Sequence, residues 1–406
     1  CVKDLALGVL KIMQAFLQAP DQAANLVTLE YVQILMTLLG SQDEVVLLQS
    51  MRVATILTTL PSLRHLISLS KIVRTVSRSV VDLSQISTKL CKAFAKFYVN
   101  VTLEESPSGM DSLLEGDIHT ALLRLLREPN ATFGVKAVAV RAVQNLLSLP
   151  AVGIKLASSF FELLVSFLCE AGDINAAMAL YNISCIPQCR TELVEAKVHL
   201  RLLDFLVQNR DQAMKSSLLQ ILVQMSSSNI CVLELLKQDL IVKMEAQIRG
   251  VTSADIWNDV SLMLLAVVAF AAKDLNEVEE ISVVRILQII CVPGVPDKVL
   301  ENCSNVLKYI SVRFSPFMHL SPVVRAILSI SSTDNDEVVE NLSNVLYNMT
   351  CSDSNISSML QDSQYVDIMI HIMRNGSLEV QENIAQCMRN FCANPKCIEI
   401  LLRTDI

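Results

Sequence analysis

An eleven-residue stretch occurs three times in the C-terminal third of this sequence. The copies read ENCSNVLKYIS at 301–311, ENLSNVLYNMT at 340–350 and ENIAQCMRNFC at 382–392. In each copy, apolar residues recur at helical spacing on one face, and polar residues occupy the opposite face. Because both faces are preserved in all three copies, the sequence predicts one helical unit that is repeated along the chain.

The polar face of this helix is rich in asparagine. In the middle copy, Val338, Leu342 and Val345 are predicted to face inward, whereas Asn341, Asn344 and Asn348 form a polar stripe expected to face solvent. Asn302 and Asn383 take the place of Asn341 in the other two copies, so we expect them on the exposed side as well. Each copy follows a second apolar segment and a short polar turn, as in VVRAILSISSTDNDE at 323–337.

The position of Asn348 recurs along the chain, and we call it the marker position. Its interval is about 42 residues, which is typical of HEAT or armadillo repeats. The marker residues predicted from the pattern are Thr58, Asn100, Asn145, Asn182, Gln224, Ala269, Tyr309, Asn348 and Asn390.

Three stretches carry a family resemblance. VDIMIHIMRNGSLEVQENIAQCMRNF at 366–391 resembles an armadillo repeat almost throughout, and LLRLLREPN…AVAVRAVQNLL and LLVSFLCEAGDINAAMALYNIS resemble it well. The resemblance covers nearly all of the chain. It implies an all-α fold, a right-handed superhelical solenoid of about nine armadillo-type repeats. The expected boundaries are a partial repeat at 1–30 and repeats at 31–70, 71–116, 117–159, 160–196, 197–239, 240–280, 281–322, 323–364 and 365–406.

The resemblance also implies a binding groove. In armadillo proteins the third helix of each repeat lines a concave face, and the marker asparagines bind the backbone of an extended peptide. The alternative is that these positions are solvated and bind nothing. The groove residues implied here are Lys96, Asn100, Arg141, Asn145, Met178, Asn182, Gln220, Gln224, Asn305, Tyr309, Asn344, Asn348, Gln386 and Asn390.

The residue one turn before the marker argues against one family ligand. Nuclear-import adaptors place a tryptophan there to hold lysine side chains, whereas this chain has Lys96, Arg141 and Met178 at that position and its sole tryptophan, Trp257, lies elsewhere. Beta-catenin-like proteins bind acidic ligands in a strongly basic groove. Basic residues at these positions occur here only around Lys89, Lys96 and Arg141, so that similarity is partial.

Composition excludes several classes of function. The formal net charge of −8 disfavours nonspecific nucleic-acid binding. The longest apolar run, at 261–272, is too short to span a membrane. Around 257–272 the groove positions become Asn258, Leu262, Leu265 and Ala269, and the helix there is apolar nearly all round. Such a helix is covered either by a neighbouring repeat or by a partner. The twelve cysteines suit a reducing compartment, and the chain begins at Cys1, as a piece of a longer protein could.

No catalytic, cofactor-binding or metal-binding motif is present in the sequence. The five histidines are scattered, and neither the pair Cys185 and Cys189 nor the group Cys387, Cys392 and Cys397 has the spacing of a structural zinc site. Eight N-x-S/T sequons are interpreted as chance in a chain rich in serine and asparagine. They begin at Asn100, Asn130, Asn182, Asn302, Asn341, Asn348, Asn355 and Asn375.

These patterns predict a non-enzymatic scaffold that binds a protein peptide or helix along its concave surface, without cofactors. The alternative is a structural component of a stable cytoskeletal assembly, such as a ciliary axoneme or another microtubule array. We expect a cytoplasmic location, with association with the cytoskeleton or a cilium under the alternative.

Overall fold

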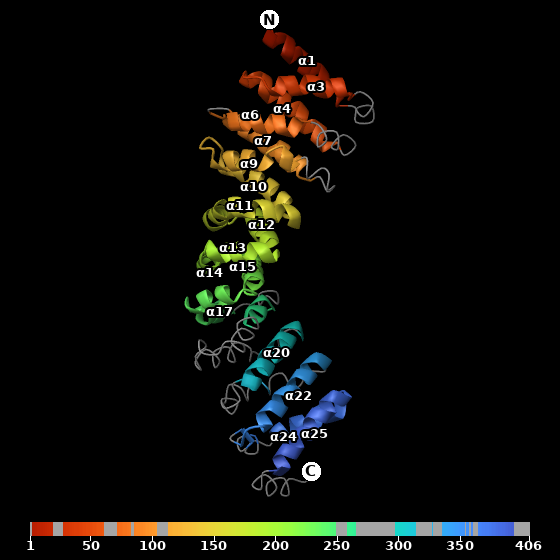
Figure 1. The fold of residues 1–406 in the computed structure, drawn as a ribbon, viewed down its shortest axis with the longest axis vertical. Coiled ribbons are helices and arrows are strands. Elements are labelled where there is room, and N and C mark those ends of the chain that lie inside the picture. Colours follow the sequence, from red (N-terminus) through yellow and green to blue (C-terminus); the bar gives the residue numbers. More distant parts are fainter. Residues whose placement is uncertain are drawn as a thin grey trace. The chain divides into compact units, whose positions relative to one another are not determined.

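The computed structural model describes most of the chain, and its described residues form helices, turns and connecting segments without a strand (Figure 1). The all-α prediction is therefore confirmed. Contacts divide the chain into two units, Cys1–Val198 and His199–Ile406, which are considered separately. The described residues are 2–18, 27–60, 71–82, 85–103, 113–248, 258–264, 297–313, 327, 335–353, 355–356, 359 and 364–393.

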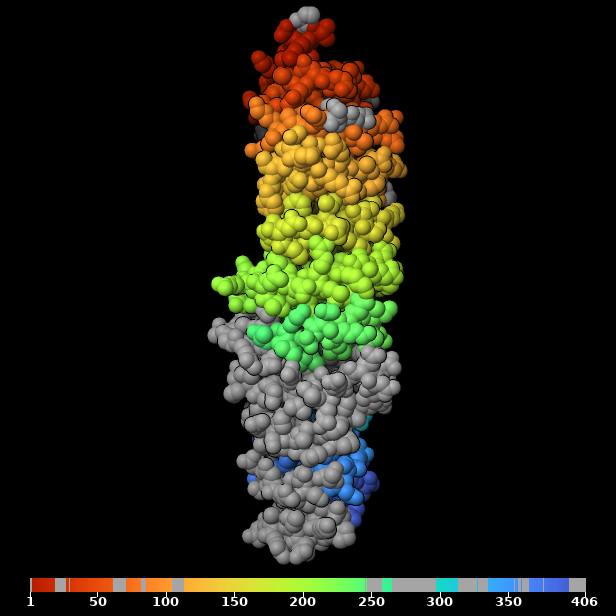
Figure 2. Space-filling model, turned by 90° about the vertical axis from the view of Figure 1, so that its left-hand side faces the viewer, coloured from red at the N-terminus to blue at the C-terminus, as the bar shows by residue number. Residues whose placement is uncertain are grey.

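Unit 1 is a stack of helices in two rows. One row, which we call the third-helix row, packs each member on the next: α1 (Val2–Phe16), α4 (Glu44–Thr59), α7 (Thr88–Val101), α10 (Phe133–Leu147) and α12 (Ile174–Ser184). The second row packs likewise through α3 (Leu29–Leu39), α6 (Ile72–Asp82), α9 (Ile118–Arg127), α11 (Pro150–Ala171) and α13 (Pro187–Glu195). Within this unit, Figure 2 shows the surface as successive bands in sequence order, as expected for a stack of repeats.

Unit 2 continues the pattern. It begins with α14 (Val198–Gln208), α15 (Gln212–Met225), α16 (Asn229–Leu236) and α17 (Leu240–Ile248), and it ends with α20 (Asp297–Arg313), α22 (Asp336–Thr350), α24 (Gln364–Asn375) and α25 (Leu378–Ala393). Its third-helix row contains α15, the short helical segment 258–264, α20, α22 and α25. Of the apolar helix predicted at 257–272, the structure describes only residues 258–264. Leu265 and Ala269 lie outside the described residues.

Most third helices begin at a capping side chain. Asp43 accepts hydrogen bonds from the backbone N–H groups of Val45 and Val46, and Ser87 accepts one from Leu90. Such caps satisfy the backbone donors that a first helical turn leaves free. The capping side chains stand 13 residues before the marker in α7, α15, α22 and α25, whereas the α12 cap, Asp173, stands closer to Asn182. The four are Ser87, Asp211, Asn335 and Ser377. Thr132 holds the same place before α10, but its side chain makes no capping hydrogen bond.

Burial between the rows supplies the core. Phe94, Phe97 and Tyr98 of α7 are fully buried, and Phe160 of α11 is buried on the other row. By length and composition, α11 could cross a membrane, but half of its most apolar window is buried inside the unit. Because α11 packs against α9, α10, α12 and α13, we interpret it as a core helix of the stack.

Candidate partner-binding face

Side-chain amides join four of the third helices, α7, α10, α22 and α25, to the preceding one at the marker position. The Nδ2 group of Asn100 donates to the Thr58 hydroxyl at 3.0 Å, and that of Asn145 donates to Thr102 at 3.1 Å. In unit 2, Asn348 donates to Ser311 at 2.9 Å and Asn390 to Thr350 at 3.1 Å. These four bonds, which we call the marker relay, repeat one contact across successive helix pairs.

A second set of bonds lies seven residues earlier on the same helices of unit 2. Asn302 donates to the Ser261 hydroxyl at 2.9 Å, Asn341 to Ser304 at 3.0 Å and Asn383 to Ser343 at 3.0 Å. We call these bonds the upstream relay. The prediction that Asn302 and Asn341 face solvent is wrong, because they are only 4% and 3% exposed. A helical wheel places both asparagines on the polar side of their helix. That side is covered by the neighbouring third helix, whose serine hydroxyls accept hydrogen bonds from the two buried amides.

Each hydroxyl in the relays has a fixed role. Thr102 donates its proton to the carbonyl of Tyr98 at 2.8 Å, Ser311 to that of Lys308 at 2.7 Å, and Thr350 to that of Tyr347 at 2.8 Å. Because that proton is already used within the helix, the hydroxyl oxygen can only accept, and the incoming amide has to present its N–H. The marker amide therefore keeps its second N–H and its Oδ1 oxygen for other partners.

The relays explain several sequons. In Asn100-Val-Thr102 and Asn348-Met-Thr350, the asparagine bonds to the preceding helix and the hydroxyl two residues later accepts from the following one. Asn341-Leu-Ser343 plays the same part in the upstream relay. The interpretation of these sequons as chance is therefore wrong, since the spacing is the signature of the inter-repeat bond.

Asn182 is an informative exception. No hydrogen bond of its side chain is found within the described residues, and the acceptor position on the preceding helix α10 holds Leu147, which has no hydroxyl. The Asn182 side chain instead lines a pocket of about 370 Å³ together with Leu147, Ser148 and Cys185. The relay thus depends on the residue two positions after the preceding marker.

The relay also corrects the register of the first complete repeat. Thr58 accepts from Asn100 as Thr102 accepts from Asn145, so Thr58 takes the hydroxyl place and the marker of α4 is Ile56. The N-cap Asp43 lies 13 residues before Ile56, the same spacing as from Ser87 to Asn100 and from Asn335 to Asn348. The sequence prediction of Thr58 as the marker is wrong. The pattern selected Thr58 because markers are usually polar, and threonine is polar whereas isoleucine is not.

With this register, the structure places the predicted groove residues on one row in each unit. One turn before the marker, Lys96, Arg141 and Gln220 are exposed and Met178 is 47% exposed. The corresponding Asn305, Asn344 and Gln386 are half-buried, as are the markers Asn100, Asn145, Asn182, Gln224, Asn348 and Asn390, while Tyr309 is 42% exposed. That a ligand contacts these residues stays a prediction.

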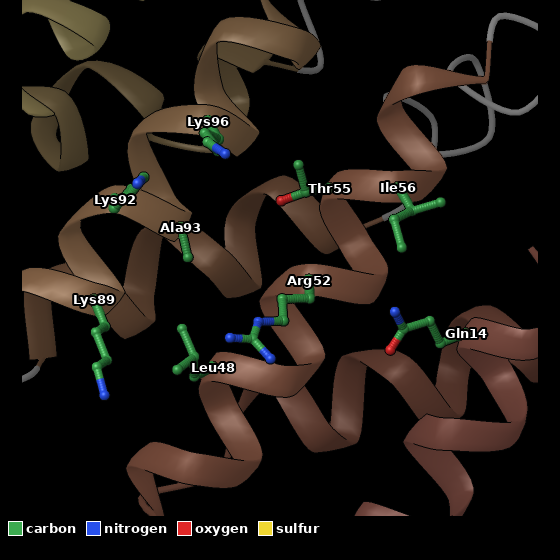
Figure 3. A pocket seen from close by; sticks show the side chains of 9 residues that line it. All are labelled: Gln14, Leu48, Arg52, Thr55, Ile56, Lys89, Lys92, Ala93 and Lys96. Carbon is green, nitrogen blue, oxygen red and sulfur yellow. The ribbon is translucent and has the colours of Figure 1, made fainter.

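The register reveals one residue that the sequence interpretation missed. Arg52 stands one turn before Ile56, so it is the α4 counterpart of Lys96. Both side chains line a pocket of about 420 Å³ between α1, α4 and α7, which Figure 3 shows with Lys89, Lys92 and Lys96 following one another along α7. The sequence did contain a signal for this residue. Thr58 stands two positions after Ile56, as Thr102 stands two positions after the marker Asn100, so the hydroxyl identifies Ile56 as the marker even though Ile56 is not an asparagine.

The described residues offer little for redox or metal chemistry. No group of three or more His, Cys, Asp or Glu side chains able to hold a metal ion occurs among them. Burial raises the pKa of the Cys231 and Cys387 thiols to about 12, and burial together with the Glu128 charge raises that of Cys91 to about 11. These thiols behave as small apolar core groups at neutral pH.

Comparison with known proteins rests on structure. No protein-family model matches the sequence, and no curated protein matches it. Among solved structures, an engineered protein aligns with a TM-score of 0.65 at 17% identity, covering 91% of this chain and 93% of its own. A chain from work on a phosphorylation switch that controls the interaction between cadherin and beta-catenin aligns with a TM-score of 0.66 at 16% identity, covering 90% and 77%.

The fold is armadillo-like. The likeness extends over nearly the whole of this chain, and it agrees with the two-row stack and the repeated third helix described above. A designed armadillo repeat protein aligns over 57% of the chain at 16% identity with a TM-score of 0.48. The stack of helical units seen in the structure accounts for the 42-residue period.

Proposed function

We propose that this armadillo-like chain is a non-enzymatic scaffold that binds a protein partner, as an extended peptide or a helix, along its third-helix row. The supporting observation is the row of exposed side chains one turn before the marker, on consecutive helices that pack together. In unit 1 these are Arg52, Lys96, Arg141 and Met178. The armadillo-like neighbour from the cadherin and beta-catenin work supports a protein as the kind of partner.

The marker amides suit an extended backbone. The relay engages one N–H of Asn100 and of Asn145 and leaves the Oδ1 oxygens available to accept from a partner's backbone N–H. Packed helices lie about 8–10 Å apart and an extended chain advances about 3.3 Å per residue, so roughly every third peptide residue meets a new amide. A peptide bound in this way keeps its main-chain groups satisfied.

The relay decides which variants test this proposal. Replacing a marker asparagine removes a bond between helices, so lost binding would be confounded with lost stability. The exposed residues one turn earlier carry no relay bond. The test variant is therefore Lys96→Ala/Arg141→Ala/Met178→Ala, and the matched control on the second row is Lys155→Ala/Ser158→Ala/Ser159→Ala, all exposed on α11.

The experiment is quantitative proximity labelling in the native cell with wild type, test and control chains at equal abundance. We expect the test variant to lose a defined set of labelled proteins that the control retains. Equal labelling by all three chains would overturn the proposal.

Membership of a cytoskeletal assembly, with the location that this implies, is the alternative proposal, and the same labelling distinguishes it. Tubulin or other filament proteins that stay labelled in the test variant would favour the assembly, since an array component uses other surfaces as well. Soluble cytoplasmic partners that are lost in the test variant would favour the reversible scaffold.

A further inference from the structure

We propose that unit 1 recognises two features of its partner peptide: a run of carboxylate side chains, and a bulky apolar side chain about six residues away. The carboxylates would lie at the pocket between α1, α4 and α7, and the apolar side chain would lie on α12. This inference rests on the proposed function, because it specifies which peptide the third-helix row binds.

The carboxylate subsite is the pocket of about 420 Å³ that Figure 3 shows. Four cationic side chains line it, Arg52 from α4 and Lys89, Lys92 and Lys96 from α7, together with the apolar Leu48, Ile56 and Ala93. Its lining contains no acidic residue. The pocket thus combines a concentrated positive charge with apolar surface.

The positive charge of this pocket is not neutralised from within the described part of the chain. The ion pairs found there join other residues, such as Lys3 to Asp43 and Arg124 to Glu128. Arg52 donates to the neutral side chain of Gln49 at 3.0 Å. Like charges brought together without counter-ions repel one another, and an anionic ligand relieves that repulsion.

The spacing of the cations favours several carboxylates over one compact anion. Lys89 and Lys96 are seven residues apart on one helix, which at 1.5 Å per residue corresponds to about 10 Å. A run of Asp or Glu side chains on an extended peptide spreads its charge over a similar length. The exposed Arg141 on the next helix, α10, extends the positive strip in the direction of α12.

The apolar subsite is a stripe on α12. Ile174, Met178 and Tyr181 are 45%, 47% and 37% exposed, and their spacing places them on one side of the helix. Ile174 and Met178 stand eight and four residues before the marker Asn182, as Lys92 and Lys96 do before Asn100. The lysines and the apolar side chains therefore occupy equivalent places on helices of the same row.

The distance between the subsites sets the spacing of the motif. From α7 to α12 there are two steps of the row, through α10. At about 8–10 Å per step, the separation is about 20 Å, which an extended peptide covers in about six residues.

The test is selection of a displayed random 16-residue peptide library on the full chain, followed by affinity measurement with synthetic copies of the enriched peptides. The variants are Lys92→Glu/Lys96→Glu for the carboxylate subsite and Met178→Glu for the apolar one. Lys71→Glu/Lys155→Glu is the control, because both lysines are exposed on the second-row side of unit 1, Lys71 directly before α6 and Lys155 on α11.

We expect enriched peptides to carry an acidic run and a bulky apolar residue about six positions apart. Lys92→Glu/Lys96→Glu should weaken their binding about tenfold or more and flatten its salt dependence, whereas the lysine control should change it little. Met178→Glu should lower affinity only for peptides that contain the apolar residue.

The failures are distinguishable. One outcome would overturn this inference and leave the proposed function standing. In it, the enriched peptides bind wild type and lose binding to the Arg141→Ala variant, but they show no acidic run or no fixed spacing. Enriched peptides that bind all of these variants equally, or no enrichment at all, would contradict both.

Discussion

The upstream relay predicts that one buried hydroxyl stabilises unit 2 more than its own local bond accounts for. Ser304 donates to the Glu301 carbonyl at 2.8 Å and accepts from Asn341, which is 3% exposed. In Ser304→Ala the Asn341 amide loses its acceptor in a place that water does not reach. Leaving a buried donor unsatisfied costs about 1–3 kcal/mol, so we expect a loss of about 2 kcal/mol.

Ser226→Ala is the matched control. Ser226 is buried in the same unit and donates to the Val223 carbonyl at 2.6 Å, but no side-chain amide donates to it among the described residues. Its replacement should remove only the local hydrogen bond and lower the free energy of unfolding by at most about 0.5–1.5 kcal/mol. The difference between the two variants therefore isolates the inter-helix contribution.

The assay is guanidinium denaturation combined with hydrogen exchange of the α22 peptides, because stacked repeats can open in parts. Ser304→Ala/Asn341→Leu completes a double-mutant cycle, and removing both partners should recover part of the loss. Equal costs for Ser304→Ala and Ser226→Ala, or additive effects within about 0.5 kcal/mol in the cycle, would refute the reasoning.

Two further predictions concern titratable groups. Iodoacetamide at pH 7.5 should modify the exposed Cys185, Cys351 and Cys392 in the folded chain well before Cys91, Cys231 and Cys387, because burial raises the pKa of the latter three thiols; peptide mass spectrometry that finds Cys231 modified as fast as Cys185 would contradict this. The hydrogen bond from Lys3, followed by those from the Val46 and Val45 N–H groups, lowers the pKa of Asp43, so its stabilising contribution is present above the unfolded-state pKa and is lost as the pH falls through the lower folded value. The melting temperature of Asp43→Asn should therefore lie below that of wild type at pH 6 and approach it below about pH 4, and a difference that is unchanged at low pH would argue against the ion pair.

The sequence predicts the helical units well because each third helix repeats both of its faces. Val338, Leu342 and Val345 are fully buried, as the apolar period indicates. The N-cap side chains are likewise readable, since Asp211 and Asn335 each stand 13 residues before a marker. Local periodicity and capping chemistry are sufficient for these features.

The polar contacts between repeats cannot be predicted from the sequence pattern of a single helix. Asn341 and Asn348 fall on the same polar side of a helical wheel, yet Asn341 is buried against α20 and Asn348 is half-buried. The difference depends on where the neighbouring helix lies, which the periodicity of one helix does not contain. Arg52 was missed for a related reason, because the polar Thr58 took the marker place of the apolar Ile56.

The most direct test of the partner-binding face is site-specific photo-crosslinking in the native cell. Benzoylphenylalanine would replace Arg141 on the third-helix row of unit 1 and Gln386 on that of unit 2, and also Ser159 and Arg374 on the exposed surface of the helices α11 and α24. The scaffold account predicts crosslinks to a protein partner from the third-helix positions Arg141 and Gln386, and none to that partner from Ser159 or Arg374. Crosslinks to the partner only from Ser159 and Arg374 would contradict it.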